Sequence, residues 1–356
     1  MPIKIKSGLK DYTVNTATDY NFLLPFINDA FSFFVVDKKV YELYKDTAVG
    51  LIKPENLVLL DVNENMKNLD TVSMLYEEAV KIKAKKNLTV VSIGGGITQD
   101  VTGFFADSVY RGVKWVFVPT TLLAQADSCI GAKTSLNYKQ FKNLVGTFYA
   151  PDEIYINTAF VKTLSEIDYY SGVGEIAKLC IMDSFESSGY FKDNLDKIAA
   201  RDEAFLSEII EKALLVKKKY IEEDEFDRGV RNMLNYGHCF GHALESSSDF
   251  RVTHGQAVVA GMILSNIVAS KRGLLGSEKE QFYLNDILLP ILKTKKEDLA
   301  MDIDKLLSAM SKDKKNIGTG MSLVMTDDAG KMLIERNLSR EEVVYAVKKF
   351  EDYLKK

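Results

Sequence analysis

The chain of 356 residues contains three histidines, and they lie close together in the sequence. His238 and His242 are four residues apart in NYGHCFGHALE, so a helix there would place both imidazoles on one face. His254 follows in THGQAVVAGM. Two imidazoles and a carboxylate form a catalytic site of the zinc type, with one coordination position open for substrate. The alternative is an ordinary cluster of core or surface histidines. Cys239 lies one helical step from His238 and is interpreted as a packing residue.

A run of three glycines is the second candidate site. Gly94, Gly95 and Gly96 follow the apolar segment NLTVVSI and precede the helical pattern ITQDVTGFFADSVY. A glycine-rich turn between a strand and a helix lets backbone N–H groups approach a pyrophosphate at the positive helix end. The spacing GGGxxxD differs from the GxGxxG dinucleotide motif. The turn alone is therefore equally compatible with a tight connection that needs glycine for backbone reasons.

Several cations lie in segments otherwise rich in apolar or small residues. Lys133 in IGAKTSLN and Lys142–Asn143 in FKNLVG lack charged neighbours on both sides, and such donors can clamp a phosphate. For Lys212 and Lys217–Lys219, a solvated helix face is the simpler interpretation of most members. Similar isolated polar residues are Asp127, Glu175, Lys178 and Arg231.

The elements that must position these residues change in kind near residue 170. Before it, FSFFVVD (31–37), NLVLLDV (56–62), NLTVVSI (87–93) and VKWVFVP (113–119) are predicted to be buried strands. Between the second and third, Val72, Leu75, Tyr76, Ala79 and Ile82 fall on one helical face. Alternation of strand and helix predicts a Rossmann-like parallel sheet with covering helices over residues 1–170.

The segments after residue 170 have helical periodicity. They are LSEIIEKALLVKKKYIEE, RNMLNYGHCFGHALESS, GQAVVAGMILSNIVASKR and SREEVVYAVKKFEDYLKK. In the last segment, Ser339 and Glu342 have the spacing of a capping box. We therefore expect an all-helical domain over residues 171–356.

Composition limits the class of protein. Hydrophobic residues make up 46% and charged residues 27%, as in ordinary globular domains. No signal peptide or apolar run of membrane-spanning length is seen. Three scattered cysteines argue against a disulfide framework, and a net charge of −4 gives no general attraction to nucleic acid. We expect a cytoplasmic protein that binds neither membrane nor nucleic acid.

A set of motifs in a fixed order resembles one known family. The motifs are GGGITQDVTGF, YRGVKWVFVPTTLLAQADSCIGAKT, FKNLVGTFYAP, GVGEIAK, RNMLNYGHCFGHALE, THGQAVVAGM and DKKNIG. Together they resemble the dehydroquinate synthases and related sugar-phosphate cyclases, from about residue 35 almost to the C-terminus. The resemblance implies an NAD-binding α/β domain, a helical domain that binds metal and substrate, and a homodimer.

The resemblance also implies residue roles. It assigns one divalent metal, zinc or alternatively cobalt, to Glu175, His238 and His254, and makes His242 a substrate contact. NAD contacts are implied for Asp37, Glu64, Lys67, Gly94, Gly95, Gly96, Asp100, Thr120, Thr121 and Thr163. Substrate contacts are implied for Asp127, Lys133, Lys142, Asn143, Lys178, Lys217, Arg231, Asn235, His242 and either Lys314 or Lys315. Arg111 corresponds to an arginine that reaches the phosphate in a neighbouring subunit.

The implied activity is a lyase reaction on a sugar-acid phosphate. In the family, 3-deoxy-D-arabino-heptulosonate 7-phosphate gives 3-dehydroquinate and phosphate. Transient oxidation by NAD is followed by phosphate elimination, re-reduction and intramolecular aldol closure. Lys178, His242, Asp127 and Lys217 are the expected catalytic residues. Lys133, Asn143, Asn235 and His242 would hold the phosphate, whereas Lys217 and Arg231 would pair with the substrate carboxylate.

Three positions depart from the usual synthase pattern. Gln99 and Ala132 replace glycines, and Gln256 replaces a glutamate. We expect Gln99 to alter the approach to the pyrophosphate and Gln256 to weaken orientation of a metal ligand. A cyclase producing 2-deoxy-scyllo-inosose or 2-epi-5-epi-valiolone is therefore an alternative, although Lys217 and Arg231 favour a substrate with a carboxylate. A metal-dependent polyol dehydrogenase and a non-catalytic binding protein are further alternatives.

Overall fold

The computed structural model describes residues 2–139, 141–248, 251–311 and 321–355. The chain forms two compact units. The first comprises Met1–Leu164 and Leu206–Phe226, and the second comprises Ser165–Phe205 and Asp227–Lys356. Lys314 and Lys315 lie outside the described residues.

The first unit is built on a seven-stranded sheet in the order β1-β2-β9-β6-β5-β3-β4. Its strands are β1 (Ile3–Ile5), β2 (Tyr12–Thr16), β3 (Ser32–Asp37), β4 (Leu57–Leu60), β5 (Thr89–Gly94), β6 (Lys114–Pro119) and β9 (Glu153–Ile156). All neighbours pair in parallel except β1 and β2, which form an antiparallel edge. The four strands predicted from apolar runs are β3 to β6, so the expected parallel sheet is confirmed.

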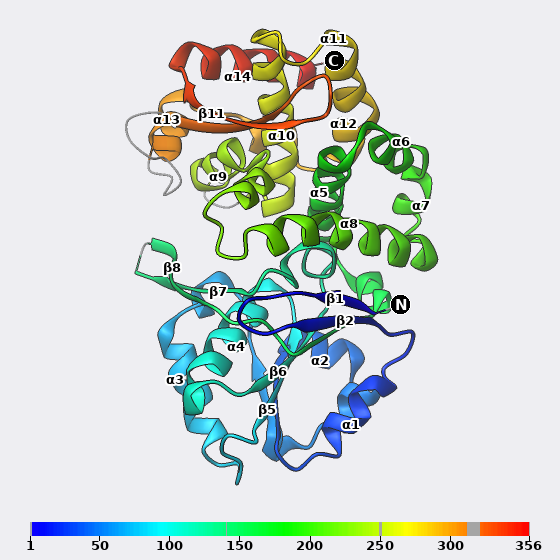
Figure 1. Ribbon diagram of the computed structural model, residues 1–356, viewed down its shortest axis with the longest axis vertical. Coiled ribbons are helices and arrows are strands. Elements are labelled where there is room, and N and C mark those ends of the chain that lie inside the picture. Colours follow the sequence, from blue (N-terminus) through cyan, green and yellow to red (C-terminus); the bar gives the residue numbers. More distant parts are fainter. Residues whose placement is uncertain (1, 140, 249–250, 312–320, 356) are drawn as a thin grey trace. The chain divides into compact units, whose positions relative to one another are not determined.

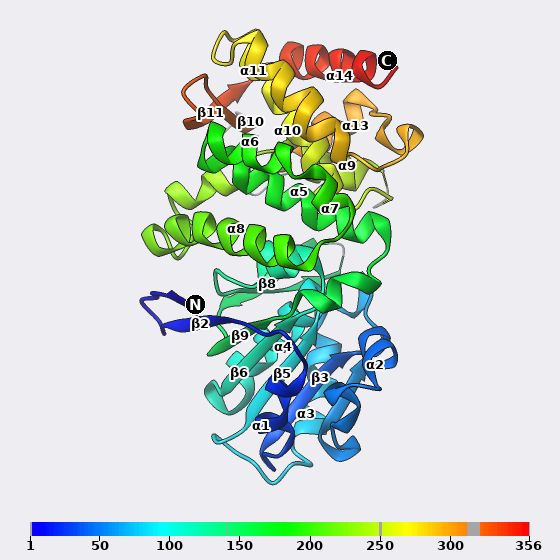
Figure 2. The ribbon, with the colours of Figure 1, turned by 90° about the vertical axis from the view of Figure 1, so that its right-hand side faces the viewer.

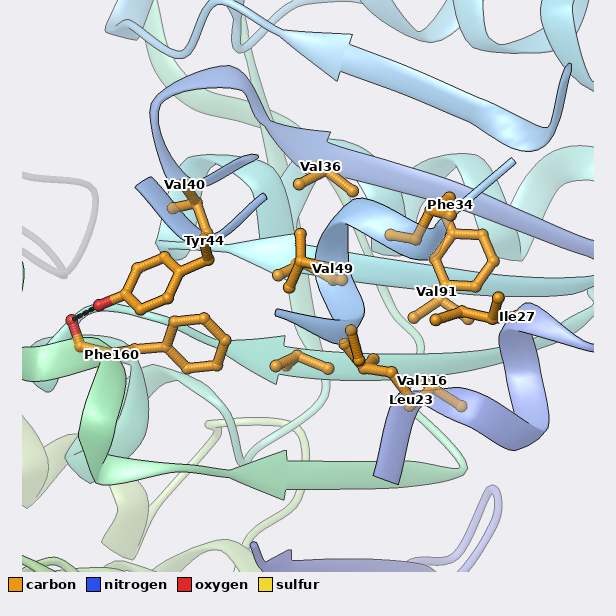
Figure 3. Close-up of a cluster of buried hydrophobic side chains, with 14 residues drawn as sticks. Leu23, Ile27, Phe34, Val36, Val40, Tyr44, Val49, Val91, Val116 and Phe160 are labelled. Carbon is orange, nitrogen blue, oxygen red and sulfur yellow. Dashed lines mark hydrogen bonds between the residues drawn. The ribbon is translucent and has the colours of Figure 1, made fainter. Parts of the chain in front are cut away.

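Helices cover both faces of this sheet. Adjacent residues of a strand point to opposite faces, so each face has side chains that pack against a helical layer. Phe33 packs its ring against Phe105 of α4 (Gly96–Ser108), beside α3 (Leu69–Ala79). Phe34 points the other way, toward α1 (Leu24–Ile27) and α2 (Lys38–Tyr44). Figure 3 shows this second cluster, in which the Tyr44 hydroxyl donates to the carbonyl of Phe160 at 3.2 Å. The strands lie between these two helical layers in Figure 1.

Two further features of the first unit lie outside the strand–helix alternation. An antiparallel hairpin, β7 (Lys133–Tyr138) and β8 (Phe141–Phe148), packs against α4. The long helix α8 (Glu203–Glu223) also contributes to this unit through Leu206–Phe226. The hairpin was not predicted, because its two strands follow a helix-rich segment without a long apolar run.

The second unit is helical around a fully buried central helix. Its helices are α5 (Glu166–Asp183), α6 (Phe185–Asp193), α7 (Leu195–Ala199), α9 (His238–Ser247), α10 (His254–Lys271), α11 (Ser277–Gln281), α12 (Leu289–Ile291), α13 (Ile303–Ser311) and α14 (Arg340–Lys355). Every residue of α10 from Gly255 to Ala269 is buried, and the helix packs against α5, α9 and α14. Both views show α9 beside α10 (Figures 1 and 2).

The expectation of an all-helical second half needs one correction. Met321–Thr326 (β10) and Met332–Leu338 (β11) form an antiparallel hairpin, joined by a turn at Asp327–Gly330. The Asp-Asp-Ala-Gly turn between two apolar runs is the signal that the sequence offered. The predicted capping box is confirmed, because Glu342 N–H donates to Ser339 Oγ and Ser339 N–H donates to Glu342 Oε2. None of the described helices is long and apolar enough to cross a membrane.

Candidate active site

The second unit brings Glu175, His238 and His254 together. One ligand atom from each side chain lies within 4.8 Å of the others. His254 Nε2 is 3.5 Å and His238 Nε2 is 3.8 Å from the same carboxylate oxygen, Glu175 Oε1. Both histidines are the first residues of their helices, α9 and α10, and Glu175 lies in the middle of α5.

Glycines next to these residues let the three helices approach closely enough to form the cluster. A Cβ on Gly255, which follows His254, would lie 1.8 Å from the Ser171 carbonyl oxygen of α5. A Cβ on Gly174, which precedes Glu175, would lie 2.6 Å from the Gly255 carbonyl oxygen. A Cβ on Gly261 of α10 would lie 1.9 Å from the carbonyl oxygen of Gly237, which precedes His238. Side chains at these positions would separate the helices and so the three candidate ligands.

Glu175 is held as an anion in the interior. Its side chain is 0% exposed, and it forms an ion pair with Lys178, which is 2% exposed. Burial would raise the pKa of Glu175, but the charges of Lys178 and His254 outweigh it and hold the pKa below its ordinary value. Its Oε2 pairs with Lys178, and its Oε1 faces the Nε2 atoms of both imidazoles. A buried carboxylate with one oxygen facing two imidazoles fits a metal ligand.

His254 lies between two carboxylates. Burial would lower the pKa of His254, but hydrogen bonds to Glu175 and Glu245 outweigh it and raise the pKa to about 10. The Nδ1 atom lies 3.3 Å from Glu245 Oε2, on the side of the ring away from Glu175. In the metal-free protein this imidazole is therefore protonated on both ring nitrogens at neutral pH. Metal binding would displace one of these two protons.

His242 lies beside the other two imidazoles. Its ring centroid is 5.3 Å from that of His238 and 5.8 Å from that of His254. His242, Glu245 and His254 form a second group whose ligand atoms lie within 4.8 Å of one another. Cys239 is a free thiol and belongs to neither group among the described residues.

The glycine turn of the first unit joins β5 to α4. Gly94 ends the strand, Gly95 caps the helix without a side-chain hydrogen bond, and Gly96 is the first helical residue. A Cβ on Gly95 would lie 3.0 Å from Thr121 Cγ2. Thr120 N–H donates to the carbonyl of Gly94 at 2.9 Å, so the ends of β5 and β6 are joined beside the turn. The uncapped helix end can accept an anionic group.

A charged network lies along one side of α4. Lys67, which is 7% exposed, pairs with Asp100 at 2.6 Å and donates to Asn143 Oδ1 at 2.6 Å. Burial raises the pKa of Asp100 in spite of the opposing charge of Lys67. Glu64 pairs with Lys142 at 3.4 Å. Five of the predicted contacts to cofactor or substrate are thus joined through Lys67 and Glu64.

Other predicted residues of the first unit are more scattered. Asp37 caps α2 through Lys39 N–H, and Thr163 Oγ1 is 2.9 Å from the Tyr44 hydroxyl. Burial raises the pKa of Asp37 in spite of this hydrogen bond. Lys133 and Arg111 are exposed, and Arg111 has a left-handed backbone (φ 65°).

Asp127 and Lys217 form a separate pair. Lys217 Nζ is 3.0 Å from Asp127 Oδ1 and donates to the Asp127 carbonyl at 2.7 Å. Asp127 lies in a short π-helical segment, Ala124–Ser128, and Lys217 comes from α8. Lys217 is therefore paired with this carboxylate. It does not belong to the solvated helix face that was predicted for most of Lys217–Lys219.

Burial separates the predicted cations from ordinary surface charges. The buried lysines and arginines of the described chain are Lys67, Lys178, Lys217 and Arg231. All four were predicted to contact cofactor or substrate. Long cationic side chains are rarely buried without a partner, and each of these lysines faces a carboxylate. Arg231 and Asn235 lie in a 3-10 segment, Val230–Asn235, which leads into α9.

Comparison with known proteins decides the family. Residues 57–171 match the model of the 3-dehydroquinate synthase N-terminal region, and residues 172–316 match that of the C-terminal region. The chain is 33% identical over 351 residues to the 3-dehydroquinate synthase of Dictyoglomus turgidum (strain DSM 6724 / Z-1310), covering 97% of this chain and 98% of that protein. The chain belongs to the 3-dehydroquinate synthase family.

Solved structures of related cyclases share the fold. A 2-deoxy-scyllo-inosose synthase, complexed with carbaglucose-6-phosphate, NAD+ and Co2+, has a TM-score of 0.85 at 22% identity. The 2-epi-5-epi-valiolone synthase of Streptomyces hygroscopicus subsp. jinggangensis 5008, with NAD+ and Zn2+ bound, has a TM-score of 0.83 at 22% identity. Each alignment covers 98% of this chain and 99% of the other. The expected fold class is confirmed, with the β10–β11 hairpin as the exception to the predicted all-helical half.

Gln256 differs from what we expected. It does not reach the candidate metal ligands: its amide donates to the carbonyls of Tyr170 and Ile291, and its oxygen accepts from Lys293 N–H. A glutamate there would face two carbonyl oxygens, so an amide suits this environment. The side-chain amide of Gln99 forms two hydrogen bonds with Ser128, of 2.6 and 2.7 Å.

The third departure places a side chain on a left-handed backbone. Ala132 has φ 62°, a conformation that glycine adopts without strain. Nothing in the structure explains why alanine stands at this position.

One polar residue of the synthase motif was missed by the sequence analysis. Glu245 follows His242 by three residues and His238 by seven, so all three lie on one face of α9. That spacing was the signal that could have identified it.

Proposed function

We propose that the protein catalyses the conversion of 3-deoxy-D-arabino-heptulosonate 7-phosphate into 3-dehydroquinate and phosphate. The observation that carries this proposal is the convergence of Glu175, His238 and His254, in a chain related over its whole length to 3-dehydroquinate synthases. The reaction is a phosphate-eliminating lyase reaction that depends on NAD and one divalent metal.

Glu175, His238 and His254 would hold the metal, zinc or alternatively cobalt. The buried carboxylate of Glu175, whose Oε1 faces both imidazoles, fits such an ion, and oxygen–imidazole sites accept both metals. The metal, when bound, would polarise a substrate hydroxyl, and NAD would take up and return a hydride. Lys178, paired with Glu175 in the metal-free protein, is close enough to the ion site to contact a substrate bound there.

The first unit would hold NAD through its glycine turn. The turn presents backbone N–H groups at an uncapped helix end, which suits a pyrophosphate. Further contacts would come from Asp37, Glu64, Lys67, Asp100, Thr120, Thr121 and Thr163. The fixed pairing of Lys67 with Asp100 keeps one of these side chains in place before the cofactor arrives.

The sugar-acid phosphate would be held by the buried and semi-buried cations. Lys133, Asn143, Asn235 and His242 would bind the phosphate, and Lys217 and Arg231 would bind the carboxylate. Lys142 would be a further substrate contact. A buried guanidinium and ammonium favour an anionic partner, since an unpaired buried charge is costly. His242 and Lys178 would assist proton transfer with the departing phosphate as base, and Asp127 would orient Lys217.

We also propose that the protein works as a homodimer in the cytoplasm. The exposed Arg111 would reach the phosphate bound in the partner subunit. All three cysteines are free thiols, which suits a reducing compartment.

The deciding experiment measures phosphate release and 3-dehydroquinate formation with substoichiometric NAD. We expect many turnovers per NAD, loss of turnover after chelation, and recovery with zinc or cobalt. Glucose 6-phosphate and sedoheptulose 7-phosphate serve as competing substrates. Preferred turnover of either would support a variant cyclase, and stoichiometric NADH from a polyol would support a dehydrogenase. Each of these results contradicts the proposal.

A further inference from the structure

Both candidate imidazole ligands present the same nitrogen to Glu175, while the opposite nitrogen is bound elsewhere. His238 Nδ1 lies 3.1 Å from the Tyr236 carbonyl oxygen. His254 Nδ1 lies 3.3 Å from Glu245 Oε2. Carbonyl and carboxylate oxygens only accept hydrogen bonds, so Nδ1 is the donor in both rings. Each ring then has Nε2 available for an ion beside Glu175.

The two rings differ in how firmly their surroundings hold them. The His238 side chain is 11% exposed and is bound to the backbone two residues earlier in the chain. The His254 side chain is 35% exposed, so packing constrains it less. Its Nδ1 partner is a side chain of another helix, and that partner is only 16% exposed. The orientation of His254 therefore depends more on one side-chain contact than that of His238 does.

His254 also belongs to two competing groups of potential ligands. Its Nε2 faces Glu175, whereas its Nδ1 faces Glu245 in the group with His242. A neutral imidazole has one lone pair, so it can serve only one of these groups at a time. A hydrogen bond from Nδ1 to a carboxylate places that lone pair on Nε2.

We propose that Glu245 is a positioning residue that fixes the tautomer and orientation of His254. It thereby directs the metal to Glu175, His238 and His254 and leaves His242 free to contact substrate. The inference rests on the metal centre of the proposed function and adds a residue to it. Loss of such a partner of a metal ligand typically weakens metal affinity 10- to 100-fold.

The test compares zinc affinity among full-length variants. Apoprotein is titrated in competition with a chromophoric zinc chelator, which measures affinity without any need for catalysis. We expect Glu245→Ala to bind zinc about 10- to 100-fold more weakly than wild type. Glu245→Gln should be intermediate, because its amide oxygen still accepts from Nδ1 but carries no charge. Glu186→Gln, an exposed position on α6, is the matched control and should match wild type.

A direct readout of the tautomer accompanies the titration. In the zinc-loaded wild type, 15N NMR of the histidines should show His254 protonated at Nδ1, and this signal should broaden or shift in Glu245→Ala. Circular dichroism establishes that the variant is folded.

Two results overturn the inference. One is wild-type zinc affinity and tautomer in folded Glu245→Ala. The other is a fall in stoichiometry from two zinc ions to one at unchanged affinity, which would make Glu245 a ligand of a second ion. If wild-type protein binds no zinc or cobalt, the proposed metal centre itself fails and the inference fails with it. If the wild type binds zinc and Glu245→Ala binds it with the same affinity, the inference about Glu245 is rejected and the proposed metal centre stands.

Discussion

Two glutamates are buried among the described residues of the second unit, and different kinds of side chain surround them. Glu280 of α11 accepts hydrogen bonds from Lys349 Nζ at 2.7 Å and from the Tyr353 hydroxyl at 3.1 Å. Glu175 of α5 pairs with Lys178 through Oε2 and faces His238 and His254 through Oε1. Both side chains are nearly inaccessible, at 3% and 0%.

The difference distinguishes a carboxylate used in helix packing, Glu280, from one in a candidate metal site, Glu175. The donors of Glu280 come from the C-terminal helix α14, so the carboxylate joins α11 to α14. The neighbours of Glu175 are themselves candidate ligands or substrate contacts, namely Lys178, His238 and His254. Burial alone does not identify a functional carboxylate. The decisive feature is whether its neighbours are candidate ligands or side chains that only join two helices.

The largest expected effect follows replacement of Glu175. In Glu175→Gln we expect zinc affinity to fall by more than about a hundredfold, since loss of a ligand should exceed loss of a ligand's partner. Zinc at about 100 times its dissociation constant should stabilise wild type by about 2.7 kcal/mol, and this gain should disappear in the variant. Thermal unfolding with and without zinc measures it. A full zinc-induced rise in Tm in Glu175→Gln contradicts the assignment.

The sequence identified two of the three members of the Glu175 cluster, His238 and His254, unaided. Helical spacing placed His238 and His242 on one face, which the ring separations confirm. It could not bring Glu175 to them, because that contact depends on close packing of α5 against α10 at Gly174 and Gly255. Glu175 was identified as an isolated polar residue, and its role as a metal ligand came only from the family resemblance. Tertiary proximity of residues this far apart has no local signal.

The fold was predictable where a periodic pattern was long. Apolar runs identified β3 to β6, and helical periodicity identified α8, α9, α10 and α14 but not α5. The hairpins β7–β8 and β10–β11 were missed, because short antiparallel strands depend on turn geometry and cross-strand packing. The partners of Gln256 were equally hidden, since they are backbone carbonyls from two separate segments.

The second expected effect is a pH dependence confined to the Glu175 region. His254, with a pKa raised to about 10, must lose a proton when metal binds. Apparent zinc affinity should therefore rise about tenfold per pH unit, or about a hundredfold from about pH 6 to about pH 8. Competition titrations at several pH values measure this. Affinity that stays constant across that range would falsify a protonated His254 in the apoprotein.

The same pKa shift sets the stability of the metal-free protein. Because the folded pKa lies above the ordinary value of 6.5, the stabilisation is complete below about pH 6.5. It is lost as pH rises through about 10. The pKa of Lys349 is also raised, by hydrogen bonds to Glu280 and Tyr353 that outweigh the effect of burial. Chelated protein should thus lose stability between neutral pH and about pH 10, mainly through His254.

The smallest expected effect follows replacement of Glu280, and it completes the comparison. Glu280→Gln keeps the shape of the side chain but removes the charge that pairs with Lys349. Because Lys349 is 29% exposed, solvent screens the pair, and we expect the free energy of unfolding to fall by only about 1–2 kcal/mol. Urea unfolding in the presence of chelator measures the change. Glu278→Gln, an exposed position on the same helix α11, is the control.

Zinc binding distinguishes the two glutamates most clearly. Glu280→Gln should retain wild-type zinc affinity and the full zinc-induced rise in Tm, because its oxygens contribute to helix packing alone. If Glu280→Gln weakened zinc binding as much as Glu175→Gln, the two regions would be coupled. A satisfied buried carboxylate could then no longer be assigned to structure on the basis of its hydrogen bonds.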